Sequence, residues 1–160
     1  MIIVLMGVTA CGKTTIGKIL AQQLSLPFIE GDNFHPKENI VKMSSGVPLT
    51  DEDRYPWLRA LSNELHVQEQ KKGAVLACSA LKEHYREILQ QGVQKKIIWV
   101  YLEASEKTLR ERMKDRKGHF MPEELLRSQL ETLEIPAYAY NFSVEKDPET
   151  IAKKIADIIA

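Results

Sequence analysis

Short runs of apolar and β-branched residues recur along the chain, and longer stretches with a helical spacing of apolar positions separate them. Runs that are continuous in apolar or β-branched character are typical of parallel strands buried on both faces. They predict strands at Ile2–Met6, Phe28–Glu30, Ala74–Cys78, Ile97–Leu102 and Tyr140–Val144. The alternation predicts an α/β fold in three layers, with helices on both faces of a five-stranded parallel sheet.

Helices are expected where apolar side chains recur every three or four residues. The clearest apolar faces consist of Ile16, Ile19, Leu20 and Leu24 near the amino terminus and of Ile151, Ile155, Ile158 and Ile159 at the carboxyl end. A longer helix is predicted from Trp57 to about Gln70, with inward-pointing residues Leu58, Leu61 and Leu65. His66 lies on this helix, and we expect it to be a surface or locally hydrogen-bonded histidine rather than a catalyst.

The size of the chain favours one compact domain spanning residues 1–160, without a separate substrate domain. Lys plus Arg and Asp plus Glu each number 22, so no net field would draw the chain to nucleic acid or a membrane surface, and a small-molecule partner is expected. The apolar run Met1–Met6 is too short for a signal segment or a membrane span. Together with the presence of only two cysteines, this favours a cytoplasmic location.

The segment Gly7–Thr14 fits the phosphate-binding pattern G-x-x-x-x-G-K-[ST], directly after a predicted strand and at the start of a predicted helix. Backbone N–H groups of such a P-loop, together with the helix N-terminus, supply positive potential for the phosphates of ATP. Lys13 is expected to act in catalysis by neutralising the β- and γ-phosphates, and Thr14 to place its hydroxyl on Mg²⁺. The predicted nucleotide-binding residues of the loop are Gly7, Val8, Thr9, Ala10, Cys11, Gly12, Lys13, Thr14 and Thr15. The motif predicts an α/β fold of the P-loop NTPase type, although Thr15 can equally be just the next residue of the helix.

A carboxylate follows the second predicted strand, in the segment Glu30–Pro36. In a parallel sheet the carboxyl ends of the strands open onto one crevice, so Asp32 should face the γ-phosphate held by the P-loop. There it can accept a hydrogen bond from an attacking hydroxyl and orient it in line, which makes Asp32 a candidate catalytic residue. As an alternative, Asp32 caps the short helix that begins near Pro36.

Three consecutive segments, Gly31–Pro36, Asn39–Met43 and Gly46–Leu58, resemble the signature of the gluconokinase family. The likeness continues through residues 78–82, 85–86, 112, 116, 118–121 and 128–129, and therefore covers nearly the whole chain. It implies transfer of phosphate from ATP to the terminal hydroxyl of D-gluconate, on a fold similar to those of shikimate and adenylate kinases. It also suggests a substrate-binding arm at about residues 33–72, a lid at about residues 112–124 and a homodimer.

An anionic sugar acid needs a cation for its carboxylate and polar groups for its hydroxyls. We expect Arg54 to bind the carboxylate, oriented by Asp51 and Asp53; alternatively, Arg54 forms a solvated ion pair with one of these acids. His35 and Lys42 are candidates to contact the oxygens of the substrate. Because His35 precedes a proline, it can equally serve as a turn residue.

The third predicted strand ends in Cys78-Ser79 and offers no Walker-B aspartate to support a metal ion. The resemblance makes the loop at Ser79 part of the substrate wall. Gluconokinases typically carry Asp-x-Asp after the second strand, whereas this chain reads Glu30-Gly31-Asp32. The first acid is one methylene longer, so Glu30 is predicted to hold Mg²⁺ through water while Thr14 contacts it directly.

Arg112 and Arg116 fall four residues apart on one face of a predicted helix. Like charges at this spacing repel each other, so an ATP phosphate explains the pair better than helix stability does. The alternative is a solvated helix face. Arg116 is the predicted catalytic cation of the lid, and the Gly and Pro residues within Lys117–Pro122 suit a segment that closes over the nucleotide.

Two other functions fit parts of the same sequence. The acceptor can be another small metabolite, such as a different aldonate, shikimate or a nucleoside monophosphate, which a substrate panel would separate. The chain can also be a nucleotide-binding regulator, for which ATP turnover that ignores every sugar acid would be diagnostic. Cys11 would make activity sensitive to thiol oxidation only if its side chain were exposed and its pKa lowered.

Overall fold

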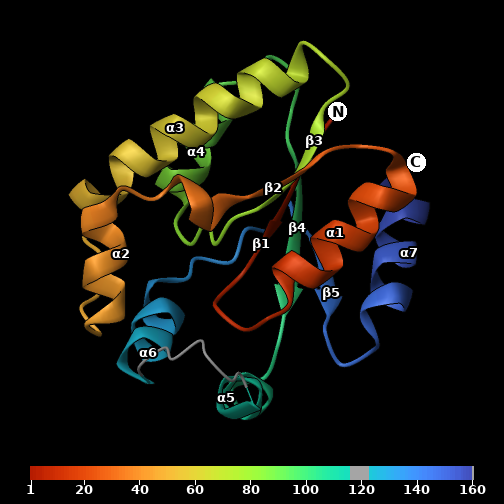
Figure 1. The fold of residues 1–160 in the computed structure, drawn as a ribbon. Coiled ribbons are helices and arrows are strands. Elements are labelled where there is room, and N and C mark those ends of the chain that lie inside the picture. Colours follow the sequence, from red (N-terminus) through yellow and green to blue (C-terminus); the bar gives the residue numbers. More distant parts are fainter. Residues whose placement is uncertain (116–122, 160) are drawn as a thin grey trace.

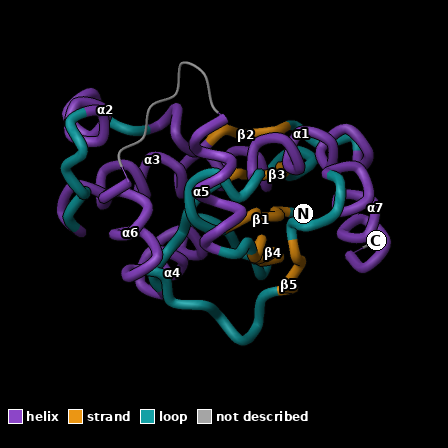
Figure 2. The backbone as a smooth tube through the Cα atoms, turned by 90° about the horizontal axis from the view of Figure 1, so that it is seen from below, coloured by secondary structure: helices purple, strands orange, loops and turns teal. Residues whose placement is uncertain are grey.

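The computed structural model of the chain describes residues 1–115 and 123–159. Its strands are β1 (Ile2–Met6), β2 (Phe28–Glu30), β3 (Ala74–Ala77), β4 (Ile98–Glu103) and β5 (Tyr140–Ser143). They form one parallel sheet in the order β2-β3-β1-β4-β5, which can be followed across Figure 2. The predicted five-stranded parallel sheet is therefore confirmed.

Helices connect the strands and cover both faces of the sheet. They are α1 (Lys13–Leu24), the 3-10 helix η1 (Gly31–Phe34), α2 (Lys37–Ser44), α3 (Asp51–Glu69), α4 (Glu83–Gln91), α5 (Glu106–Asp115), α6 (Glu123–Thr132) and α7 (Pro148–Ile159). α1 and α7 pack together on one side of the sheet and α3 and α4 on the other, so the fold has three layers (Figure 1). Between these layers, β1 is buried along its whole length. Within the described ranges, no helix has the length and apolar character needed to cross a membrane.

The helix α3 begins at Asp51, before the start at Trp57 that the apolar pattern predicts. Thr50 and Asp53 form a capping box, in which the Asp53 N–H donates to the Thr50 hydroxyl at 3.1 Å and the Thr50 N–H donates to the Asp53 carboxylate at 2.9 Å. These bonds satisfy backbone donors that the start of a helix leaves unpaired. The predicted boundary is wrong because this cap, which precedes the first apolar positions of the helix, decides where the helix begins.

The loops that carry the predicted site residues follow the carboxyl ends of three neighbouring strands. β1 leads into the P-loop, β2 into η1, and β3 into Ser79. Because β1 lies between β3 and β4, the chain fills one side of the sheet first and the other side later. Such a reversal opens a crevice at the carboxyl ends of the strands, which is where open parallel sheets bind ligands.

Candidate active site

The P-loop backbone between β1 and α1 takes a shape that favours glycine at two positions. Gly7 has φ 146° and Gly12 has φ 102°, and a Cβ at Gly7 would lie 3.0 Å from the Leu102 carbonyl oxygen. Ala10 adopts φ 65°, an uncommon value for a residue with a side chain. α1 begins at Lys13 and has no acidic residue in its first turn, so its positive end is not neutralised and can bind an anion.

The Lys13 side chain folds back over the P-loop. Its Nζ donates to the carbonyl oxygens of Gly7 at 2.9 Å and Val8 at 2.8 Å. The ammonium group is thereby held beside the backbone N–H groups of the loop. A phosphate oxygen can replace these carbonyls as its partner, because hydrogen bonds between two charged groups are stronger than those to a neutral acceptor.

Thr14 and Glu30 bring two oxygen atoms together beside Lys13. The Thr14 hydroxyl donates to Glu30 Oε2, and Glu30 Oε1 accepts from the Asp32 backbone N–H at 3.4 Å. The longer acid at position 30 therefore reaches the P-loop while it caps η1. Hydroxyl and carboxylate oxygens suit Mg²⁺, which is commonly held by one or two protein groups plus water and substrate phosphates. In the part of the chain that is described, no three His, Cys, Asp or Glu side chains converge as a metal-holding group.

Asp32 lines the same pocket as Lys13 and Thr14. Its side chain is 79% exposed. It does not cap α2, whose N-cap residue is Pro36 and has no side-chain hydrogen bond. The capping role considered for Asp32 is thus absent from α2, and its carboxylate is open to a bound molecule.

His35 lines this pocket from the connection between η1 and α2. Its ring stacks on Trp57, with ring centroids 4.1 Å apart and an angle of 16° between the planes. Its Nδ1 lies 3.2 Å from Asn39 Nδ2, and its Nε2 lies 4.0 Å from Asp32 Oδ1. Burial, and secondarily the nearby Arg54 guanidinium, lower the pKa of His35 to about 4. The imidazole is therefore uncharged at neutral pH.

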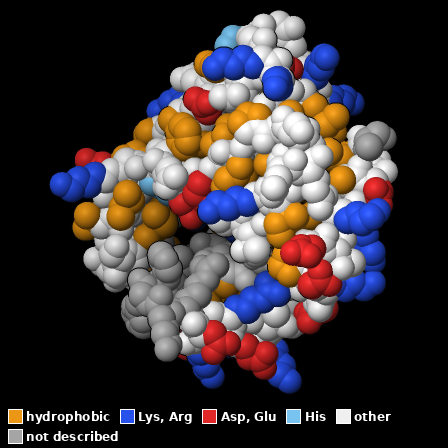
Figure 3. All heavy atoms as spheres, turned by 45° about the vertical axis from the view of Figure 1, so that its right-hand side comes forward, with side chains coloured by type: hydrophobic (Ala, Val, Ile, Leu, Met, Phe, Trp, Pro, Cys, Tyr) orange, Lys and Arg blue, Asp and Glu red, His pale blue; other side chains and the backbone are white. Residues whose placement is uncertain are grey.

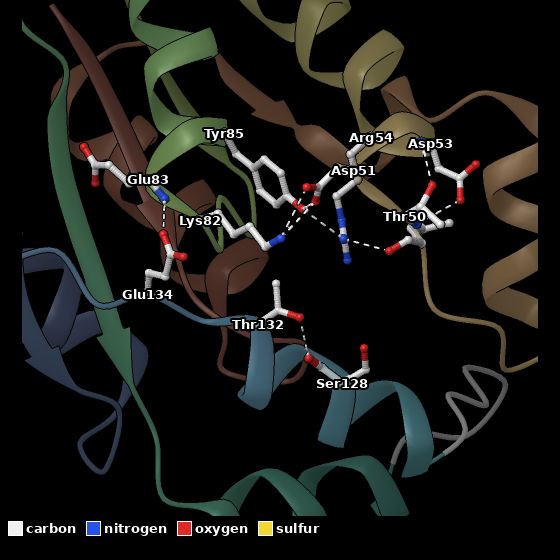
Figure 4. Close-up of polar contacts among 11 residues, drawn as sticks. Thr50, Asp51, Asp53, Arg54, Lys82, Glu83, Tyr85, Ser128, Thr132 and Glu134 are labelled. Atoms are coloured by element: carbon white, nitrogen blue, oxygen red, sulfur yellow. Dashed lines mark hydrogen bonds and ion pairs between the residues drawn. The ribbon is translucent and has the colours of Figure 1, made fainter.

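Arg54 reaches the pocket from the first turns of α3 and is buried. Its Nη1 donates to the Leu49 carbonyl oxygen at 2.8 Å and to the Tyr85 hydroxyl at 3.1 Å. Tyr85 in turn donates to Asp51, which also pairs with Lys82 at 3.1 Å. In Figure 4 the free end of the guanidinium points away from these partners and toward α6. The guanidinium is thus fixed on one side and presents its other N–H groups to the pocket.

Neither predicted orienting acid pairs directly with Arg54 among the residues described. Asp51 acts through Tyr85, while Asp53 pairs with Lys42 at 2.7 Å. The bonds from Lys42 and from the Thr50 backbone lower the pKa of Asp53 to about 2. The solvated ion pair considered for Arg54 is therefore not formed, and Lys42 stands outside the pocket lining with Asp53 as its partner.

Ser79 joins the end of β3 to the P-loop. It lines the pocket, and its carbonyl oxygen accepts from the Gly7 N–H at 3.3 Å. Figure 3 shows a hollow on this face of the molecule, with acidic and basic side chains meeting at its edge. The structure therefore brings Lys13, Thr14, Glu30, Asp32, His35, Arg54 and Ser79 around one pocket.

Arg112 reaches the P-loop from α5. Its Nη1 donates to the carbonyl oxygens of Ala10 at 3.3 Å and Cys11 at 3.1 Å, and its Nη2 donates to that of Val144 at 3.1 Å. Together with Gly12 and Thr15 it lines a second pocket. These contacts exclude the alternative of a solvated helix face for Arg112.

The predicted partner of Arg112 falls outside the described part of the chain. Arg116 and the segment 117–122 belong to the residues whose structure is not described. The catalytic role of Arg116 and the lid at about residues 112–124 consequently stay predictions. The described residues on either side of this gap belong to α5 and α6.

The sequence patterns do not single out three polar residues that adjoin the pocket. The Oε1 of Gln129 on α6 accepts from the Thr9 N–H at 2.7 Å, and both residues line the pocket. Asn39 contacts His35, and Tyr85 contacts Arg54. Gln129 and Tyr85 belong to the segments that resemble gluconokinases, and so does Asn39. That resemblance was the available signal, but it does not say what each residue touches.

Both cysteines are buried and free. Burial raises the pKa of Cys78 to about 12. Cys11 packs under the P-loop with its Sγ 3.8 Å from Lys13 Nζ. Cys11 is therefore not the exposed thiol that sensitivity to oxidation would require.

Comparisons with known proteins agree with this architecture. The family model described as "Shikimate kinase" matches residues 9–160. A gluconokinase of Gluconobacter oxydans is 45% identical over 157 residues, which cover 96% of this chain and 88% of the relative. The thermosensitive gluconokinase of Escherichia coli is 46% identical over 134 residues, covering 83% of this chain and 71% of the relative. The crystal structure of a gluconokinase from Sinorhizobium meliloti matches with a TM-score of 0.86 at 42% identity, covering 99% of this chain and 94% of that chain.

A P-loop after the first strand, with polar side chains at the ends of the next two, defines a P-loop kinase of small molecules that takes ATP as co-substrate. Within this class, the chain belongs to the gluconokinase family. The resemblance seen in the sequence is thereby confirmed.

Proposed function

We propose that this chain transfers the γ-phosphate of ATP to the terminal hydroxyl of D-gluconate, which gives 6-phospho-D-gluconate and ADP. The observation that carries the proposal is that the P-loop, Asp32 and Arg54 line one pocket. A phosphate cradle, an acceptor for a hydroxyl proton and a cation for a carboxylate then surround one small molecule. The names of the relatives support gluconate as the acceptor of the phosphate.

In the proposed reaction, Asp32 accepts the hydrogen bond of the attacking hydroxyl and receives its proton. The hydroxyl oxygen forms a bond to the γ-phosphorus while the bond from this phosphorus to the bridging oxygen breaks, and ADP leaves with the bonding electrons. Lys13 exchanges its carbonyl partners for phosphate oxygens and neutralises charge as that bond breaks. Arg112 and Arg116, in the lid proposed at about residues 112–124, bind the phosphates of ATP, and Arg116 is the catalytic cation.

The carboxylate end of the substrate is assigned to Arg54, whose guanidinium is buried and held from behind by Leu49 and Tyr85. His35 and Ser79 contact hydroxyls of the substrate. Lys42 also contacts the substrate when the arm at about residues 33–72 closes, provided that its ion pair with Asp53 opens. Each of these roles is a proposal that substitutions can test one by one.

Thr14 and Glu30 would hold Mg²⁺, since their oxygens already lie together beside Lys13. When bound, the ion would supply positive charge to the phosphates of ATP. The likeness to gluconokinases also leads us to propose a homodimer and a cytoplasmic location, which light scattering and cell fractionation can check.

A coupled ADP-release assay tests the proposed function. We expect ADP release to require D-gluconate and to be much slower with its epimers and with shikimate. Lys13→Ala serves as the inactive control, because it removes the phosphate-neutralising charge. Release that is equal with and without every sugar acid would overturn the proposal and favour a regulatory ATPase.

A further inference from the structure

The buried side chain of Asn39 settles which nitrogen of His35 carries the proton. Asn39 Nδ2 lies 2.8 Å from the backbone carbonyl oxygen of Asp53 and 3.2 Å from His35 Nδ1. A carbonyl oxygen only accepts hydrogen bonds, so the Asn39 atom that faces it must be the amide nitrogen. The same nitrogen faces His35, and therefore Nδ1 must present a lone pair.

A neutral imidazole with a lone pair on Nδ1 carries its proton on Nε2. The Nε2 atom lies 4.0 Å from Asp32 Oδ1, and stacking on Trp57 fixes the plane of the ring. The His35 side chain is only 4% exposed, whereas that of Asp32 is 79% exposed. A rigid donor thus stands beside an open acceptor at the edge of the pocket.

We propose that Asn39 is a positioning residue that holds His35 as an Nε2–H donor, and that His35 and Asp32 together bind one hydroxyl of the acceptor substrate. A hydroxyl donates one hydrogen bond and accepts others, so it matches one acceptor and one donor at the same time. The 4.0 Å between Nε2 and Oδ1 is longer than a direct hydrogen bond, which leaves both groups able to turn to a shared oxygen. The identity of the substrate in this inference rests on the proposed function.

The charged groups around the ring favour the same state. Asp32 of η1 faces Nε2, and Arg54 of α3 and Lys13 of α1 line the same pocket as the ring. Burial and the Arg54 charge lower the pKa of His35 to about 4, so the ring is neutral at neutral pH. A protonated ring would also lose the hydrogen bond from Asn39, because its Nδ1 would then be a donor.

The ¹⁵N spectrum of the imidazole in the free wild-type protein tests the assignment without any substrate. We expect a protonated Nε2 and an unprotonated Nδ1 for His35, with the exposed His84 as an internal reference. A protonated Nδ1 would overturn the proposal. Asn39→Asp keeps the shape but replaces the amide donor with a carboxylate, so we expect the His35 proton to move to Nδ1.

Kinetics with D-gluconate test the second half of the proposal. His35→Phe keeps the stack on Trp57 but removes the donor, and we expect it and Asn39→Asp each to lower kcat/KM for gluconate by about 10- to 100-fold, with KM for ATP nearly unchanged. Ser62→Ala is the matched control, because it removes a partly buried hydrogen bond from α3 to the Ile88 carbonyl oxygen of α4, and Ser62 does not line the pocket. Gluconate kinetics within about twofold of wild type in both pocket variants would contradict the proposal. Wild-type protein that ignores gluconate while showing the expected spectrum would instead refute the proposed function.

Discussion

Arg54 and Tyr85 share a hydrogen bond of 3.1 Å between the guanidinium Nη1 and the phenol oxygen, although 31 residues separate them in the chain. The phenol donates its own hydrogen bond to Asp51, and Asp51 also pairs with Lys82 (Figure 4). Burial and the bond to Asp51 raise the pKa of Tyr85 to about 12, so the phenol keeps its proton at neutral pH. Tyr85 therefore joins a buried cation to an acid without adding a charge of its own.

Removing the Tyr85 hydroxyl should leave Arg54 in the pocket but hold its guanidinium less firmly. We expect Tyr85→Phe to raise KM for gluconate by about 2- to 10-fold, the value of one neutral hydrogen bond, with a smaller change in kcat. Steady-state kinetics measure both constants. Tyr55→Phe on α3 is the matched control, since Tyr55 does not line the pocket. A Tyr85→Phe enzyme with unchanged gluconate KM would show that Arg54 needs no support from α4.

Arg54 itself is expected to bind the carboxylate in the ground state. Arg54→Ala should raise KM for gluconate by about 10- to 100-fold or more, because a charge-assisted hydrogen bond is lost, while KM for ATP changes little. Arg54→Lys should recover only part of this loss, since an ammonium cannot keep the Leu49 and Tyr85 bonds and also form a two-point contact with a carboxylate. Unchanged gluconate affinity in Arg54→Ala would assign the carboxylate to another cation.

Gln129 offers a test of the anion site that leaves the P-loop sequence intact. Its Oε1 accepts from the Thr9 N–H, so Gln129→Glu would put a carboxylate against the phosphate cradle. We expect KM for ATP to rise by about tenfold through repulsion between the two anions. Gln22→Glu on the exposed side of α1 makes the same charge change away from the pocket and should leave KM for ATP unchanged. Equal ATP kinetics in the two variants would contradict the placement of the nucleotide phosphates.

The lowered pKa of His35 makes stability depend on pH in a defined window. The folded state holds the pKa at about 4, below the ordinary value of 6.5, so between these values the unfolded chain binds a proton that the folded chain does not. The contribution of His35 is fully present above pH 6.5 and is lost as the pH falls toward 4. Urea unfolding at about pH 7.5 and about pH 4.5 should show a loss that is about 2–3 kcal/mol larger in wild type than in His35→Gln. Equal losses in the two proteins would mean that His35 titrates normally.

Local patterns in the sequence were sufficient to predict the sheet and the P-loop. Buried parallel strands are continuous apolar runs, and the phosphate loop needs glycine at fixed positions, so both can be read from neighbouring residues. The environment of Arg54 could not be read in this way. Asp53 precedes Arg54 directly, but adjacent side chains on a helix do not face each other, and Asp53 turns to Lys42 instead. The actual partner, Tyr85, depends on how α3 packs against α4.

The start of α3 was missed for a different reason. The Thr50–Asp53 capping box is a local pattern, but it precedes the apolar positions that place the predicted helix from Trp57. The tautomer of His35 is a third case. It follows from one amide that contacts both the ring and a carbonyl oxygen on α3, and no spacing along the chain predicts that geometry.

The turnover of Asp32→Asn tests the central claim most directly. The substitution keeps the shape of an exposed side chain, so the protein should fold and bind ATP as wild type does, while losing the acceptor of the hydroxyl proton. We expect kcat for gluconate phosphorylation to fall by about 10²- to 10⁴-fold, with KM for ATP nearly unchanged. A kcat within about threefold of wild type would contradict the account, because the carboxylate that shares a pocket with the P-loop would then take no part in the transfer.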